Sequence, residues 1–271
     1  MFNFVFLLKV KLMKGIDITN EILFSSIYFL IILFIGLIIK SRYQKKYPEY
    51  KYFVKGLLLK LVGVTAFCMV YLFYYGGGDT VNYFLGAKAI ANLLLQNFEV
   101  GWEVLFNTDS SYNDISSFNY ETGYFPNYMW KDNNTTAVCR FSAPFCLISN
   151  NSFFATSFLT ASFSYIGIWK IFRLFNSLYN GNTKMLAYII LFLPTLIFWG
   201  SGIMKDSYVL GATCWITYNF HQIFILRTKL VINSLFLGLN LFIILNTKAY
   251  VVVSLIPGML LWVNSAYLKN A

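Results

Sequence analysis

The chain has 271 residues, of which 58% are hydrophobic and only 12% charged; its net charge is +10 and its mean hydropathy is +0.61. A soluble domain usually carries about 25% charged residues, so this composition excludes a soluble enzyme, a disordered chain and a coiled coil. It predicts an all-α, polytopic integral membrane protein built from apolar segments of about 20 residues each.

Seven apolar segments are predicted to span the membrane, which makes residues 1–271 a single transmembrane domain. Residues 1–20 precede them; their apolar run 2–8 is too short to span and is followed by three lysines, so an interfacial helix is one interpretation. The spans must be helical because lipid offers backbone amides no hydrogen-bond partner. They are expected at 22–40, 53–75, 151–170, 185–201, 207–226, 230–246 and 250–268.

The distribution of Lys and Arg predicts the orientation. The stretch from Lys40 to Lys60 holds seven positive charges, and cytoplasmic connections are enriched in such charges. With this stretch inside, alternating sides place 13 of the 21 Lys and Arg residues in the cytoplasm. The positive charge then reflects topology, so no nucleic-acid partner is expected. Only the N-terminal lysines conflict with this orientation, since it places them outside.

One large extracytoplasmic loop, residues 76–150, separates the second and third spans. It contains seven acidic and three basic residues, so its net charge of −4 is opposite in sign to that of the whole chain. Residues 80–98 are predicted to form an amphipathic helix, because Leu85, Ala89, Asn92 and Leu93 recur near a 3.6-residue period. The remainder, rich in Ser, Asn, Tyr and Asp, is predicted to be irregular. Cys139 and Cys146 are near enough in sequence to pair, although spacing alone does not decide this.

The first of three short polar features begins this loop. Three glycines, Gly76 to Gly78, end the second span and permit a tight turn before Asp79. Asp79 either presents a carboxylate at the membrane surface or simply caps the helix that follows.

The second feature runs from Pro194 to Ser207. Pro194 predicts a kink in the fourth span, Gly200 and Gly202 reverse the chain, and Lys205-Asp206 begin the fifth span. Charges at membrane level are costly and tend to mark function. The alternative is a hairpin in which these two charges pair with each other.

The third feature is Lys248, at the turn between the sixth and seventh spans. It either snorkels harmlessly or meets a phosphate. In the predicted topology all three features share one face, which brings carboxylates (Asp79, Asp114 and Asp206) beside cations (Lys205, Lys248 and Arg140). A carboxylate can act as general base for a hydroxyl, and a cation can stabilise the charge on a departing phosphate.

Two of these motifs resemble a known group. Asp79, Tyr83 and Ala87 at the start of the first large outer loop look like the GT-C superfamily of polytopic glycosyltransferases. The stretch from Pro194 to Asp206 also resembles turns in that group and in bacterial polysaccharide polymerases. The similarity covers about 30 residues in three patches. It differs from the usual paired acid, since Thr80 follows Asp79, and members are usually longer, so we expect a compact variant or a C-terminally incomplete member.

The resemblance implies that Asp79 is the catalytic base and that Lys205 or Lys248 binds phosphate, with Tyr83, Arg140, Asp114 and Asp206 also in the substrate site. The implied reaction moves a sugar from a polyprenyl-phosphate-linked donor to a glycan or lipid acceptor in envelope polysaccharide synthesis. The protein would be a multi-pass component of the plasma (inner) membrane. No cofactor is indicated, although carboxylates suit a divalent metal.

Two other classes stay open at this point, and neither requires an enzyme. One is a transporter or flippase for lipid-linked or anionic solutes, which would typically show internal repeats and broken helices. The other is a non-enzymatic membrane subunit of an envelope complex, with residues 76–150 as its docking surface.

Overall fold

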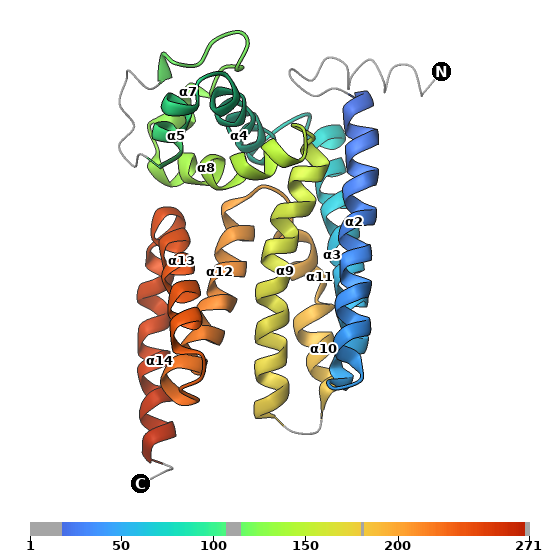
Figure 1. The fold of residues 1–271 in the computed structure, drawn as a ribbon, viewed down its shortest axis with the longest axis vertical. Coiled ribbons are helices and arrows are strands. Elements are labelled where there is room, and N and C mark those ends of the chain that lie inside the picture. Colours follow the sequence, from blue (N-terminus) through green and yellow to red (C-terminus); the bar gives the residue numbers. More distant parts are fainter. Residues whose placement is uncertain (1–17, 107–114, 180–181, 269–271) are drawn as a thin grey trace.

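The computed structural model describes residues 18–106, 115–179 and 182–268, and over these ranges the chain is helical, with no strand (Figure 1). Two layers are visible. A bundle of roughly parallel helices forms the body, and short helices lie across one end of it. The bundle helices are α2 (Ile18–Gln44), α3 (Phe53–Met69), α9 (Phe153–Leu178), α10 (Thr183–Leu191), α11 (Pro194–Trp199), α12 (Lys205–Phe220), α13 (Leu230–Lys248) and α14 (Tyr250–Leu268).

Three short helical turns extend two of these helices. A 3-10 turn, η1 (Pro48–Tyr52), precedes α3, and the π-helical turns η2 (Val70–Tyr74) and η3 (His221–Ile225) continue α3 and α12. The helices across the end are named here the helical cap: α4 (Asp79–Gln96), α5 (Phe98–Phe106), α7 (Asn127–Trp130) and α8 (Asn133–Ile148). The end of the bundle beneath it is called the capped end.

Four helical stretches are long and apolar enough to cross a membrane: Thr19–Gln44, Pro48–Tyr74, Leu230–Lys248 and Tyr250–Leu268. They coincide with the first, second, sixth and seventh predicted spans, so an all-helical chain with several membrane-spanning helices is the supported architecture. The fourth predicted span is not one kinked helix. It is divided into α10 and α11, because Pro194 begins α11 and cannot donate the backbone hydrogen bond that would continue α10.

Residues 76–150 correct the sequence analysis in one respect. The predicted helix at 80–98 is confirmed as α4, but much of the stretch expected to be irregular is helical in α5, α7 and α8. Helix α8 begins where Asp132 accepts a hydrogen bond from the Asn134 amide, and it buries small and polar residues against α4. A helix whose buried side includes Thr135, Thr136 and Ser142 gives little apolar periodicity, which explains why the pattern was missed.

Helix α9 is the centre of the bundle. It packs on α12 most closely where two glycines meet, since a Cβ added to Gly167 would lie 2.4 Å from the Gly211 carbonyl oxygen. Small residues at such a crossing let two helix backbones approach, as in many membrane proteins. At the capped end, the carboxylate of Glu21 on α2 accepts hydrogen bonds from the Ser152 hydroxyl and from the Phe153 and Phe154 amides. Glu21 therefore ties α2 to the N-terminus of α9.

Lys60 also departs from the sequence analysis, which counted it with the cytoplasmic loop. It lies inside α3 and is 2% exposed. Its ammonium donates hydrogen bonds to the carbonyls of Leu196 and Gly200, at 3.0 and 2.5 Å. Leu196 lies within α11 and Gly200 directly follows it, so the buried Lys60 side chain gives both carbonyls a hydrogen-bond partner. The count of cytoplasmic positive charges falls by one as a result.

Candidate functional site

The turn before α4 places Asp79 at the capped end. Gly76, Gly77 and Gly78 all have positive φ, at 68°, 139° and 123°, a conformation that glycine adopts without strain. Gly78 is the capping residue of α4, and its carbonyl accepts hydrogen bonds from the Val81 and Asn82 amides. Asp79 follows as the first helical residue. It is therefore not the helix cap that the alternative interpretation required, although its charge favours the positive end of the helix dipole.

The Asp79 side chain is exposed, and its carboxylate makes no hydrogen bond or ion pair with any residue that the structure describes. Its neighbours are phenols. Burial and then the Asp79 charge raise the pKa of Tyr83, and the same two causes raise the pKa of Tyr128. The ring of Tyr71 lies against Gly78. Asp79 thus lies near tyrosine side chains, and its carboxylate accepts no hydrogen bond from the described residues.

A chain of polar contacts leads from Tyr83 to Lys205. The Tyr83 hydroxyl lies close to the Thr135 side chain, which opposes the rise in the Tyr83 pKa, and the Thr135 hydroxyl donates to the Asp132 carboxylate. Asp132 in turn forms an ion pair with Lys205, with 3.2 Å between Nζ and Oδ2. Burial alone would raise the pKa of Asp132, but the Thr135 hydroxyl and the Lys205 ammonium outweigh it, so this pKa lies below its usual value. The chain connects α4, α8 and α12.

The next residue, Asp206, continues the network to α13. Its carboxylate pairs with the ammonium of Lys248, with 2.5 Å between Oδ1 and Nζ. The hairpin alternative, in which Lys205 and Asp206 pair with each other, is therefore wrong: each has a partner on another helix. Both pairs are partly exposed, and such pairs contribute little to stability. Their geometry instead holds two ammonium groups at the capped end.

The turn between α11 and α12 lies against the first turn of α4. Gly202 has a φ of 78°, and a Cβ there would lie 2.6 Å from two atoms of the Phe67 ring and 3.5 Å from the Thr80 hydroxyl. Thr80 is fully buried, and its hydroxyl has no hydrogen-bond partner among the described residues. Since Thr80 follows Asp79, the glycine-rich turn and the Pro194–Ser207 stretch meet in the fold.

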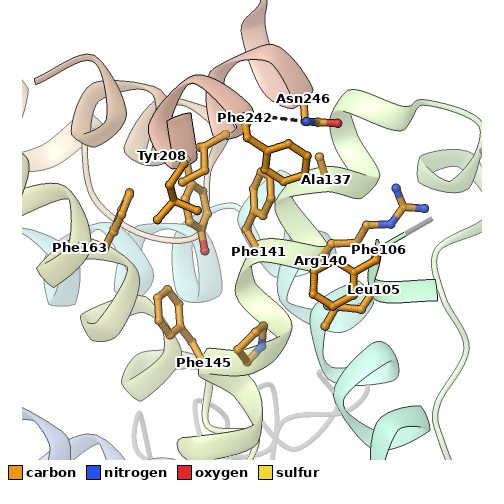
Figure 2. Close-up of a pocket in the computed structure, with 13 residues that line it drawn as sticks. Leu105, Phe106, Ala137, Arg140, Phe141, Phe145, Phe163, Tyr208, Phe242 and Asn246 are labelled. Atoms are coloured by element: carbon orange, nitrogen blue, oxygen red, sulfur yellow. Dashed lines mark hydrogen bonds between the residues drawn. The ribbon is translucent and has the colours of Figure 1, made fainter. Parts of the chain in front are cut away.

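A cavity of about 250 Å³ lies between the helical cap and the bundle (Figure 2). Its walls are mostly aromatic and aliphatic, from α5, α8, α9, α12 and α13. Arg140 and Tyr208 lie on opposite sides of Phe141 in this view. Arg140 is 7% exposed and its Nε donates to the Val104 carbonyl at 2.9 Å, while the Tyr208 hydroxyl bonds with that of Ser142. The cavity is thus an apolar space with one buried cation at its edge.

Five of the seven residues predicted for the site lie at the capped end: Asp79 and Tyr83 on α4, Lys205 and Asp206 on α12, and Lys248 on α13. Arg140 belongs to the cavity instead, and Asp114 lies outside the described residues. Asp132 is the residue that the sequence analysis missed, since it was counted only as one acid of the loop. Its sequence signal was its residue type, since Asp is favoured as the N-cap residue of a helix.

Two further expectations concern metals and thiols. Among the described residues, no group of three His, Cys, Asp or Glu side chains is arranged to hold a metal ion. Cys139 and Cys146 are both buried and free, so the pairing left open by their spacing is not formed. Burial raises the pKa of both thiols, to about 12 for Cys146, which keeps them protonated and unreactive.

Comparisons of this chain with protein-family models, with curated proteins and with solved structures find no match.

Proposed function

We propose that this chain is a membrane glycosyltransferase that moves a sugar from a polyprenyl-phosphate-linked donor to an extracytoplasmic glycan or lipid acceptor. The observation that carries the proposal is the position of the Asp79 carboxylate. It is exposed, makes no hydrogen bond or ion pair with the described residues, and stands at the same end of the bundle as the ammonium groups of Lys205 and Lys248 and an apolar cavity. A base, phosphate-binding cations and a lipid-binding space are the three parts that this reaction needs.

Asp79 would act as general base. It accepts the proton of the acceptor hydroxyl while that oxygen forms a bond to the anomeric carbon of the donor sugar. The bond between this carbon and the donor phosphate breaks, and the polyprenyl phosphate leaves with the electron pair. Lys205 and Lys248 would stabilise the charge on the departing phosphate. Because Asp132 and Asp206 already pair with them, the phosphate must share these lysines with the carboxylates.

The acceptor sugar would lie beside Asp79 on the ring of Tyr128. This side chain lies beside Asn82 and is 62% exposed, so the face of its ring is open to a sugar.

The donor chain would occupy the cavity between the cap and the bundle. A volume of about 250 Å³ with walls of Phe, Leu and Ile suits a length of apolar chain. Arg140, buried at its edge and held by the Val104 carbonyl, offers a further positive charge to the phosphate end of a lipid.

The proposed topology is a plasma (inner) membrane protein with seven spans. The four apolar helices are joined by α9, by the α10–α11 pair and by α12 with η3. In this arrangement the helical cap lies outside the cytoplasm. The cations of the stretch from Lys40 to Lys55, together with Lys170, Arg173, Lys184, Arg227 and Lys229, gather at the opposite end of the bundle, as the positive-inside bias requires.

Asp79→Asn tests the proposal. Asn keeps the shape of the side chain and removes the proton acceptor, so the rate of transfer should fall about 10²- to 10⁴-fold. The measurement is the polymer or glycolipid made in cells that lack the native copy, normalised to membrane-inserted protein. Glu103→Gln is the matched control, because Glu103 is an exposed acid on the same cap; its product should equal that of the wild type.

Normal product from Asp79→Asn would refute the enzyme proposal. The α10–α11 break is the one feature that favours a transporter, since transporters use discontinuous helices. Uptake of a labelled lipid-linked sugar into proteoliposomes that continues unchanged in Asp79→Asn would support that function instead. A third result is also possible: a strain without the protein makes no product, the protein transports no lipid-linked sugar, and Asp79→Asn is silent. This result would support the non-enzymatic envelope subunit.

A further inference from the structure

Helix α5 carries a row of exposed aromatic rings. Phe98, Trp102 and Phe106 are 65%, 51% and 57% exposed. Neighbouring rings in the row are in contact, with centroids 5.6 Å apart for Phe98 and Trp102 and 4.5 Å apart for Trp102 and Phe106. We call these three residues the aromatic stripe. Exposed aromatic patches on a protein surface commonly mark an interaction site.

The stripe has a defined position around the helix. Residues four apart are separated by about 40° at 3.6 residues per turn, so its three members lie on one side. Gly101 and Val104, on one flank of it, are buried against the rest of the cap. Glu99 and Glu103, on the other flank, are exposed. Around α5 the aromatic stripe therefore lies between a buried side and an acidic side. This arrangement is typical of a helix at a boundary between lipid and water.

The cavity fixes the level of α5 along the bundle. Leu105 and Phe106 line it together with Phe242 and Asn246, and Figure 2 shows the α5 residues on the same side as Arg140. Phe242 and Asn246 belong to the last two turns of α13, one of the four candidate spans. The end of a span lies at the edge of the hydrocarbon core, so α5 lies at this edge as well.

The exposed apolar surface is also continuous from the span to the stripe. Leu239, Phe242 and Leu245 on α13 are exposed large hydrophobic residues of a spanning helix. Phe242 reaches the cavity rim that Phe106 shares. Lipid that covers α13 therefore reaches the stripe across the mostly apolar rim of this cavity.

We propose that α5 is an interfacial helix whose aromatic stripe is inserted into the bilayer leaflet on the capped side. Trp102 then lies at the headgroup level, which tryptophan prefers in membrane proteins. The two glutamates face water. The occupant of the stripe is lipid, and the cavity beside Phe106 borders directly on the leaflet. This inference does not depend on the sugar-transfer proposal, because it concerns only where the cap lies against the membrane.

Spin labels on the full-length protein test the insertion. Trp102→Cys and Glu103→Cys are matched positions, adjacent on one exposed helix but on different sides of it. After reconstitution into vesicles of phosphatidylethanolamine and phosphatidylglycerol, a label at 102 should collide more often with oxygen, which concentrates in lipid, than with a water-soluble nickel chelate. A label at 103 should show the reverse preference. Greater access to nickel at both positions would overturn the proposal.

Native tryptophan fluorescence gives an independent reading. Phospholipids brominated on their acyl chains near the headgroup should quench the wild type more than Trp102→Phe, because the substitution removes one tryptophan that contacts lipid. Equal quenching would overturn the proposal. A second copy covering the stripe predicts that a label at 102 is shielded from both oxygen and nickel, and that Trp102→Cys cross-links to itself under oxidation. That outcome would also overturn it.

Discussion

The two ends of the helix bundle differ in the partners of their positive charges. At the capped end, Lys205 and Lys248 each pair with a carboxylate. At the opposite end six cations lie over aromatic rings: Lys170 over Trp215 and Tyr218, Arg173 over Tyr47 and Tyr50, Arg227 over Tyr267, and Arg42, Lys46 and Lys51 each over a neighbouring Tyr. The one ion pair there, among the described residues, joins Arg173 to Glu49 at 3.3 Å.

This difference has a physical meaning. Cations and tyrosines without matching acids leave a net positive rim, which suits a cytoplasmic membrane surface rich in anionic headgroups. Cations held by carboxylates are fixed in direction and nearly neutral as a group, which suits a site that must orient a substrate. The capped end also holds the buried turn at Gly202, whereas α14 has no buried residue at all. The capped end is therefore held by specific contacts between side chains, whereas α14 presents mainly exposed apolar surface.

The largest expected effect on stability comes from glycine substitutions that contrast these regions. Gly202→Ala forces alanine into a positive φ and a Cβ into the Phe67 ring, so it should destabilise the fold by about 2–4 kcal/mol. Gly238→Ala is the control on α13, where nothing lies within 4 Å; it should be neutral or stabilise by up to about 1 kcal/mol. Unfolding in mixed micelles measures both. Equal effects would contradict the contrast.

Glu21→Gln should have the next largest effect. Its carboxylate accepts three hydrogen bonds in a buried position, and an amide can present only one oxygen to these donors. The expected loss is about 1.5–3 kcal/mol, again from unfolding in micelles. Glu99→Gln, at an exposed position of the cap, should change stability by less than about 0.5 kcal/mol. A silent Glu21→Gln would show that α2 is not held to α9 in this way.

The smallest effect is a pH dependence at the capped end. The pKa of Asp132 is lowered in the fold, so its ion pair with Lys205 contributes stability above the ordinary Asp pKa of about 4 and loses it as the pH falls through the depressed value. The pair is half exposed, so its contribution is at most about 1 kcal/mol. Asp132→Asn keeps the helix cap and should therefore differ from the wild type at pH 7 but not at pH 2. A difference that persists at pH 2 would assign the effect to something other than charge.

The parts of the fold that could be predicted from sequence are those that depend on local chemistry. Apolar runs located the four helices that are long and apolar enough to cross a membrane, and the glycines before Asp79 predicted the turn that the structure contains. The meeting of the Asp79 turn with the Pro194–Ser207 stretch was expected only from topology, yet Gly202 and Thr80 do lie together.

The remaining features depend on contacts between distant residues. Asp132 gains its role from Lys205, 73 positions away, and no local pattern signals that pairing. Lys60 was counted with the positive stretch from Lys40 to Lys60, although it also falls within the predicted span at 53–75. Its partners, the carbonyls of Leu196 and Gly200, are 136 and 140 residues distant. Arg140 was expected beside the other cations, but its bond to Val104 places it at the cavity.

The central claim is that the capped end faces away from the cytoplasm, and one labelling experiment tests it directly. Tyr120→Cys places a thiol on the cap at a residue that is 89% exposed, and Lys45→Cys places one at the opposite end. Three of the natural cysteines are buried and Cys214 is partly so, which keeps the background low. A membrane-impermeant maleimide added to intact cells should label position 120, and position 45 only after permeabilisation. Labelling of 45 but not 120 in intact cells would contradict the account.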